Sequence, residues 1–257
     1  MNNNPIGFFD SGVGGTSIWK EVHALLPRES TIYLADSRNA PYGEKSKEEI
    51  IKLSIKNTRI LLDKKCKMIV VACNTATTNA IKELRAQFDI PFIGIEPAIK
   101  PAANNTRTQT IGVLATKGTL SSELFNKAVE FHQETRIVEQ VGHGLVQLIE
   151  NGEINSPKMT KLLESYLLPM VDQNIDFLVL GCSHYPYLIP KIKQLIPAHI
   201  QIIDSGQAVA RQTRNVLIER QLLSNSESTH HKFLTNVDKT VLEKILDNSY
   251  EVIIEDF

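Results

Sequence analysis

The feature that most constrains the fold of this chain is a repeated alternation of short apolar segments with longer amphipathic segments. The apolar segments have the length of β-strands, and the amphipathic segments have the spacing of helices. Strands that alternate with helices form parallel sheets covered by helices on both faces, so the pattern predicts an α/β fold. We predict strands at Ile6–Phe9, Thr31–Ala35, Met68–Ala72, Phe92–Ile95, Thr110–Ala115, Ile137–Gln140, Phe177–Leu180 and Gln201–Ile203.

Two of the predicted helices have clear start signals. Ser46 is followed three residues later by Glu49, which is the pattern of a capping box. Ser156 and Pro157 form a typical pair of N-cap and first-turn residues. We expect these helices to end near Lys64 and Val171, and further helices to end near Leu26 and Phe88 and to span Ser121–Phe131 and Ser205–Leu222.

The two halves of the chain carry the same pattern in the same order. The segment Ile6–Ser11 resembles Ile111–Thr116, and Met68–Thr75 resembles Phe177–His184, with a cysteine at the equivalent place in the second pair. We interpret this repetition as two similar α/β domains. Each would be a mostly parallel sheet flanked by helices, with an active-site cleft between the domains.

The predicted boundary between the domains lies near Pro97 and Pro101, because two prolines so close together disfavour continuous secondary structure. The N-terminal domain is expected to comprise residues 1–97 plus a returning segment, 207–257, and the second domain residues 98–206. Edge strands are predicted at Lys232–Leu234 and Glu251–Ile254, and the pattern leaves open which sheet they join.

Composition argues against several functions. The 28 Lys and Arg residues are balanced by 29 Asp and Glu residues, whereas a general nucleic-acid binder is normally basic. The apolar runs are far shorter than the ~20 residues of a membrane helix, and the first residues lack the features of a secretion signal. Three cysteines are too few for a disulfide-stabilised secreted fold, so we expect a cytoplasmic protein. A small-molecule partner is favoured over nucleic acid or membrane, and a homodimer is compatible with the sequence.

Cys73 and Cys182 are the strongest candidates for catalysis. Each ends an apolar strand and is followed by small polar residues before the chain continues. In a parallel sheet this position faces the crevice where ligands bind, and a following helix N-terminus favours the thiolate. One thiol from each domain would then face an interdomain cleft.

Other interpretations of the cysteines are weaker or remain open. Free cysteines are often simply buried, but the repeated context makes this less favoured for Cys73 and Cys182. A redox disulfide between these two residues remains open. A metal site is disfavoured, because the chain has no Cys-x-x-Cys pair and only His184 lies close to either cysteine. Cys66 lacks the polar turn and is interpreted as structural.

The Gly-rich loop Asp10–Gly15 follows the first predicted strand. It matches neither Gly-x-Gly-x-x-Gly nor a phosphate-binding P-loop, so nucleotide binding is disfavoured. Its backbone N–H groups could hold a carboxylate, and the Asp10 side chain could hold an ammonium group. His184 is a candidate acid–base partner for the neighbouring Cys182 thiol.

Taken together, these stretches resemble the cofactor-independent aspartate/glutamate racemase family. The resemblance spans roughly residues 6–206 and is carried by Phe9–Gly15, Asp36–Gly43, Ala72–Thr77, Gly94–Pro101, Gly112–Thr116 and Gly181–Pro186. It implies an isomerase that interconverts L- and D-glutamate without a cofactor or metal and supplies D-glutamate for peptidoglycan.

The resemblance also implies roles for individual residues. Cys73 and Cys182 match the two catalytic cysteines, Asp10 and His184 match groups that assist them, and Glu150 matches a further acidic helper. The positions that match substrate contacts are Asp10, Ser11, Tyr42, Gly43, Asn74, Thr75, Thr116, Ser183 and His184.

Two stretches depart from the family pattern. Ser183 stands where the family usually has threonine, and the retained hydroxyl suggests a small effect. The segment Val141–Gly144 replaces a pattern that usually contains Cys-Pro, which affects the expected geometry around Glu150.

Paired thiols suit racemisation, because one group must remove the Cα proton while another returns a proton to the opposite face. Similar groups suit a reaction whose two directions are mirror images, and a thiol can titrate near the working pH. Aspartate racemase, or another small-acid isomerase of the family, is the nearest alternative. A two-domain module that binds an amino acid without turnover is a more distant one.

Overall fold

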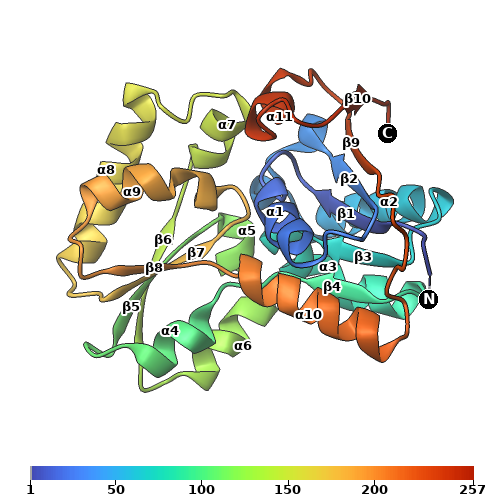
Figure 1. Cartoon of the computed structure of the whole chain (residues 1–257). Coiled ribbons are helices and arrows are strands. Elements are labelled where there is room, and N and C mark those ends of the chain that lie inside the picture. The colour runs from blue at the N-terminus through green and yellow to red at the C-terminus, as the bar shows by residue number, and fades with distance from the viewer. Residues whose placement is uncertain (1) are drawn as a thin grey trace.

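The computed structural model describes residues 2–257 and contains two parallel β-sheets lying side by side, each covered by helices (Figure 1). The strands are β1 (Ile6–Asp10), β2 (Thr31–Ala35), β3 (Met68–Val71), β4 (Phe92–Gly94), β5 (Thr110–Ala115), β6 (Arg136–Val141), β7 (Phe177–Gly181), β8 (Gln201–Ile203), β9 (His231–Thr235) and β10 (Val252–Ile254). The α/β class and every strand predicted from the sequence are therefore confirmed.

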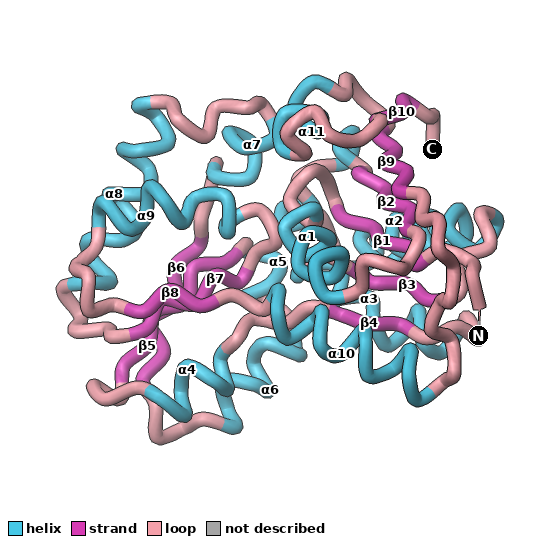
Figure 2. The backbone as a smooth tube through the Cα atoms, in the orientation of Figure 1, coloured by secondary structure: helices cyan, strands magenta, loops and turns pink. Residues whose placement is uncertain are grey.

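The helices alternate with the strands, as the tube in Figure 2 shows. They are α1 (Thr16–Leu25), α2 (Lys47–Asp63), α3 (Asn74–Gln87), α4 (Ile99–Asn105), α5 (Lys117–Leu120), α6 (Glu123–Phe131), α7 (Leu145–Glu150), α8 (Pro157–Val171), α9 (Ile189–Leu195), α10 (Gly206–Glu219) and α11 (Thr240–Ile245). Short 3₁₀ turns span Ser37–Asn39, Tyr42–Glu44 and Tyr185–Leu188.

The two sheets repeat one strand order. The larger sheet runs β10-β9-β2-β1-β3-β4 and the smaller sheet runs β6-β5-β7-β8. The core order β2-β1-β3-β4 is thus equivalent to β6-β5-β7-β8, which agrees with the repetition seen in the sequence. Cys73 follows β3 and Cys182 follows β7, so the two cysteines occupy equivalent positions in the two sheets.

The C-terminal part of the chain returns to the larger sheet. Strand β9 pairs in parallel with β2, and β10 pairs with β9, which answers the question that the sequence left open. Helix α10 packs on α1 and β4 of the same sheet. Ser205 donates a hydrogen bond to the carbonyl of Glu96. The two segments that connect one sheet to the other therefore lie next to each other. The domain limits at residues 97 and 206 stay a prediction.

The start signals read from the sequence form the expected caps. Ser46 and Glu49 make a complete capping box at α2, and the Ser156 hydroxyl accepts a hydrogen bond from the Met159 amide at α8. One expectation is wrong: helix α4 begins inside the segment Pro97–Pro101, where we predicted a break. Pro101 is the third residue of α4, and a helix tolerates proline there because first-turn N–H groups have no helical partner.

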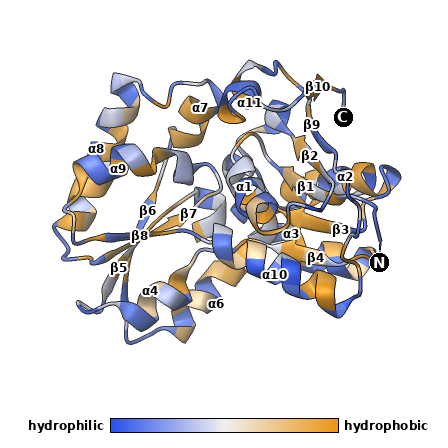
Figure 3. Cartoon of the chain, viewed as in Figure 1, coloured by the Kyte–Doolittle hydropathy of each residue, from blue (hydrophilic) through white to orange (hydrophobic). Residues whose placement is uncertain are grey.

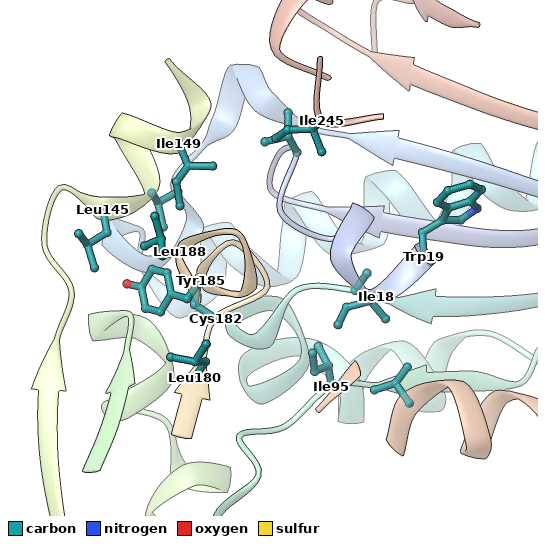
Figure 4. Packing of buried hydrophobic residues seen from close by; sticks show 14 of the residues in the cluster. Ile18, Trp19, Ile95, Leu145, Ile149, Leu180, Cys182, Tyr185, Leu188 and Ile245 are labelled. Carbon is teal, nitrogen blue, oxygen red and sulfur yellow. The ribbon is translucent and has the colours of Figure 1, made fainter. Parts of the chain in front are cut away.

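Apolar packing continues from one sheet to the other. Ile18 and Trp19 on α1 belong to the same buried cluster as Cys182 and Tyr185, as the close view in Figure 4 shows. Figure 3 shows the mixed hydropathy of the helices that cover the sheets. Among residues 2–257, no helix combines the length and apolar character that crossing a membrane requires.

Candidate active site

The candidate catalytic residues gather where the carboxyl ends of three strands approach the boundary between the sheets. Asp10 is the last residue of β1, Cys73 follows β3, and Cys182 follows β7. His184 lies in the turn after Cys182, and Glu150 is the last residue of α7. These positions follow from the parallel topology, because it brings the carboxyl ends of neighbouring strands to one edge.

The first thiol lies at the N-terminus of α3. Cys73 is the N-cap residue, and its Sγ accepts a hydrogen bond from the Ala76 amide at 3.4 Å. The same sulfur lies 3.9 Å from the Ser11 hydroxyl oxygen. Burial, together with the negative charge of Asp10, raises the pKa of Cys73 well above its ordinary value. In this arrangement Cys73 is therefore a protonated thiol, which can act as an acid.

The second thiol faces a histidine. Cys182 Sγ lies 3.8 Å from His184 Nδ1, and His184 Nε2 donates to a Glu150 carboxylate oxygen at 2.6 Å. Burial alone would lower the pKa of His184. The hydrogen bonds to Cys182 and Glu150 and the charge of Asp10 outweigh it and raise this pKa well above its ordinary value. The resulting imidazolium places a positive charge beside the Cys182 sulfur.

Asp10 is close to both thiol-bearing segments, because its charge acts on Cys73 and its carboxylate contacts Ser183, next to Cys182. One of its carboxylate oxygens accepts a hydrogen bond from the Gly15 amide at 2.8 Å, and the other accepts one from the Ser183 hydroxyl at 3.2 Å. Burial raises the pKa of Asp10, although the nearby His184 opposes this shift. The Asp10 side chain is fully buried, and its two hydrogen bonds join the Gly-rich loop of the larger sheet to the Cys182 turn of the smaller sheet.

Glu150 reaches from the smaller sheet to elements of the larger one. Its carboxylate accepts hydrogen bonds from the Val13 amide at 2.7 Å and from the Ser37 hydroxyl at 2.8 Å. A Cβ atom on Gly12 would lie only 2.0 Å from a Glu150 carboxylate oxygen, so this approach requires glycine. The unusual segment before α7 thus still delivers Glu150 to His184, and its catalytic role stays a prediction.

The residues predicted to contact substrate lie around the thiols. The hydroxyl oxygens of Thr75 and Thr116 are 2.8 Å apart, which joins the starts of α3 and α5. Gly43 packs so closely on Thr116 that a Cβ atom would lie 2.7 Å from it. The Tyr42 hydroxyl donates a hydrogen bond to the Asp36 carboxylate at 2.6 Å, and Tyr42 belongs to the same buried cluster as Cys73.

Asn74 is the most informative of these residues. Its side chain is 2 % exposed, and neither its amide nitrogen nor its amide oxygen has a hydrogen-bond partner among residues 2–257. Buried polar groups normally have partners, because leaving one unpaired costs about 1–3 kcal/mol. Asn74 directly follows Cys73, so its free groups are available to a ligand held beside that thiol.

Sequence reasoning gave no role to several residues that build this site. The Asp36 carboxylate, at the end of β2, accepts hydrogen bonds from Tyr42, Asn39 and Asn236, and so holds the Tyr42–Gly43 turn. Asp36 could have been identified from the sequence, because it is an acidic residue that directly follows a predicted parallel strand. Thr119, Val13 and Ser37 carried no such signal.

All three cysteines are free thiols in the structure, so Cys73 and Cys182 are not joined in the disulfide that the sequence left open. Cys66 is buried away from this cluster, against Gly7 and Leu61. Burial raises the pKa of Cys66 to about 12, which makes it unreactive.

Two similar α/β units that each bring one thiol to a shared, buried acid–base cluster are the architecture of an amino-acid racemase, which is an isomerase. The model of the Asp/Glu/Hydantoin racemase family matches residues 15–213. The chain belongs to this family.

Similar proteins cover nearly the whole chain. The glutamate racemase of Pseudomonas entomophila is 45% identical over 94% of this chain and 92% of its own length. That of Herpetosiphon aurantiacus is 43% identical over 95% of this chain and 97% of its own length.

Solved structures give the same result. A glutamate racemase from Bacillus anthracis superposes with a TM-score of 0.89 at 31% identity and covers 100% of this chain and 98% of its own. The Escherichia coli glutamate racemase, in complex with L-glutamate and the activator UDP-MurNAc-ala, gives a TM-score of 0.86 at 32% identity, with 98% and 97% covered.

Proposed function

We propose that this protein interconverts L- and D-glutamate by exchanging the Cα proton between Cys73 and Cys182. The observation that carries the proposal is that two buried thiols from equivalent positions in two sheets both lie close to Asp10. The charge of Asp10 acts on Cys73, and Asp10 accepts a hydrogen bond from Ser183, the residue next to Cys182. Their electrostatic environments are coupled, because the charge of Cys182 contributes to the raised pKa of Cys73. The identity of 42–45% with curated glutamate racemases supports glutamate as the substrate.

The proposed reaction needs one thiolate and one thiol at a time. The thiolate takes the Cα proton and becomes a thiol, and the electron pair of the broken C–H bond stays on the substrate as a carbanion. The opposite thiol then gives its proton to the other face of Cα and becomes a thiolate. The burial of Cys73, which raises its pKa, supports the role of acid for this thiol in one direction. Cys182 lies beside His184, at 3.8 Å from Nδ1 of its ring.

Stabilising the carbanion is the difficult part of the reaction, since its charge spreads into the carboxylate next to Cα. The N-terminus of α3, with Asn74 and Thr75 in its first turn, offers free backbone N–H groups and a positive dipole end. A substrate carboxylate placed there would be stabilised more strongly as its charge increases. Exclusion of water from the buried cluster strengthens the same interaction.

The space beside two of the predicted substrate residues is small. The cavity that Gly43 and Thr116 line together with Gly142 has a volume of only about 20 Å³. That space suits about one water molecule and not an amino acid. We therefore infer that this arrangement is a closed form and that catalysis alternates between closed and open forms.

Asn74 provides a direct test of the substrate site. Asn74→Ala is expected to raise KM for glutamate by about 10- to 100-fold, because hydrogen bonds to a charged ligand contribute about 1.5–3 kcal/mol. Its stability in urea is expected to stay within about 1 kcal/mol of wild type, because the amide has no partner in the free protein.

The matched comparison for this variant is Asn57→Ala. Asn57 is also a buried amide, but it donates to the Tyr42 hydroxyl at 3.1 Å, so its loss is expected to cost stability. A KM for Asn74→Ala within twofold of wild type would remove Asn74 from the substrate site.

The function itself is tested by following the inversion of L- and D-glutamate with circular dichroism, without added cofactor. Both enantiomers should reach the same racemic end point, and glutamate should react much faster than aspartate. Faster turnover of aspartate would reassign the substrate within the family, and binding without inversion would indicate a binding module.

The wider biological setting belongs to the same proposal. The product D-glutamate would supply peptidoglycan synthesis, and the three free thiols fit a cytoplasmic location. A homodimer is part of the proposal and is tested by light scattering of the purified protein.

A further inference from the structure

The turn that carries Cys182 and His184 is tied to the opposite sheet by the contacts of Ser183 with Asp10 and of His184 with Gly14, and by two further hydrogen bonds. Both come from the first turn of α1, which belongs to the larger sheet, whereas Cys182 follows β7 of the smaller sheet. The bonds reach residues 183 and 187, one on each side of His184. The thiol-bearing turn is therefore fixed on both sides by an element from outside its own sheet.

The first bond joins Ser17 to the backbone of the turn. The Ser17 hydroxyl donates to the carbonyl oxygen of Ser183 at 2.8 Å. Ser183 stands directly between Cys182 and His184, so this bond fixes the peptide that links the thiol to its imidazolium partner.

The second bond joins two hydroxyl groups. Thr16 Oγ1 and the Tyr187 hydroxyl oxygen are 2.5 Å apart, and the Thr16 hydroxyl also lies 2.6 Å from the carbonyl of Val13, to which it donates. Tyr187 therefore donates to Thr16. Burial raises the pKa of Tyr187, so its hydroxyl keeps this proton throughout the working pH range. The Lys20 ammonium group lies 5.6 Å from the centre of the Tyr187 ring and further restrains it.

We propose that Ser17 and Tyr187 are positioning residues that set the place of the Cys182 thiol relative to the Cys73 thiol. Cys73 is fixed by β3 and α3 in the larger sheet, so no bond within either sheet can set the separation of the two sulfur atoms. Only contacts between the sheets can do so, and these two bonds act on the turn that bears Cys182 itself. This inference rests on the proposed two-thiol racemisation.

The physical reason for such ties is the sensitivity of proton transfer to distance. The two sulfur atoms must lie on opposite faces of one carbon atom, and a misplacement of about 1 Å can reduce a rate by about 10²-fold. A turn held only by its own sheet would move with every small change in the angle between the sheets. Because the hydrogen bonds come from α1, the Cys182 thiol reaches its position when the two sheets come together.

The test uses Tyr187→Phe and Ser17→Ala in the full-length protein. Each removes one hydroxyl and keeps the packing, and alanine is well tolerated in a helix. We expect kcat/KM to fall by about 10- to 100-fold for each variant. The fall must be equal for L- and D-glutamate, because the enantiomers have equal free energy and the equilibrium constant is one.

The deciding readout is the primary isotope effect on kcat/KM with glutamate deuterated at Cα. Slowing transfer at Cys182 makes that step more rate-limiting. The isotope effect should then rise for the enantiomer whose proton Cys182 removes and fall for the other, whose proton Cys73 removes. A variant that is only partly folded loses rate but keeps both isotope effects.

Tyr166→Phe is the matched control. Its hydroxyl donates to the carbonyl of His143 at 2.9 Å, so it also loses one tyrosine hydrogen bond, but both residues belong to the part of the chain that forms the smaller sheet. Its rate and isotope effects should match wild type.

The outcomes separate the two proposals. Unchanged isotope effects in both Tyr187→Phe and Ser17→Ala, with an active wild-type enzyme, would overturn the positioning role alone. A wild-type protein that does not racemise glutamate would overturn the proposed function and this inference with it.

Discussion

Replacing either Cys73 or Cys182 with serine is expected to lower kcat/KM for glutamate racemisation by about 10²- to 10⁴-fold in both directions, the range usually contributed by a general acid or base. A serine hydroxyl has a pKa far above that of a thiol, so it is a poor base at neutral pH. Circular dichroism from each enantiomer in turn measures the loss. In heavy water, the product formed by the wild-type enzyme should carry deuterium at Cα.

Cys66→Ala is the control for these variants. Cys66 is buried and its sulfur packs against Gly7. It shares an apolar core with Cys73, but it precedes β3 whereas Cys73 follows β3, so the two thiols lie at opposite ends of this strand. Its replacement should leave the racemisation rate close to wild type. A Cys73→Ser or Cys182→Ser enzyme that retains the wild-type rate in both directions would contradict the two-thiol mechanism.

Gly14→Ala is expected to cause the second large loss, about 10²-fold in kcat/KM together with about 1–3 kcal/mol of stability. A Cβ atom at Gly14 would lie 2.1 Å from Nδ1 of the His184 ring and 2.4 Å from its Cγ. The ring is 1 % exposed and bonded to Glu150, so it cannot move aside without leaving Cys182. Racemisation assays and urea unfolding measure the two losses.

A double variant identifies the cause of this loss. In Gly14→Ala combined with His184→Ala, the imidazole that clashes with the new methyl group is absent. Adding Gly14→Ala to the His184→Ala protein should therefore cost little further stability. If Gly14→Ala lowers stability equally in both backgrounds, close packing against His184 is not its cause.

The strands could be predicted because each is buried in a parallel sheet, where side chains on both faces are apolar. Burial of every residue in β1, β3 and β5 produces the continuous apolar runs that are visible in the sequence. The short helices α7 and α11 were missed because one or two turns are too short to show a helical period.

The thiols and Asp10 could be predicted from their positions at strand ends. Parallel topology brings Asp10 and Cys73 to one edge of the larger sheet and places Cys182 at the equivalent edge of the smaller sheet. The contacts of Glu150 with Val13 and Ser37 could not be predicted, since they depend on how the two sheets are oriented. The same holds for the bond between Thr16 and Tyr187. Such contacts join residues that are distant in the sequence and carry no local signal.

The position of β9 between β2 and β10 has a consequence for biogenesis. The smaller sheet is built from one continuous stretch of chain, whereas the larger sheet needs a strand that the ribosome makes only after β5–β8 are complete. The nascent polypeptide can thus complete its middle portion first, while the edge of β2 stays open to incorrect pairing. The protein should become active only after β9 has paired with β2.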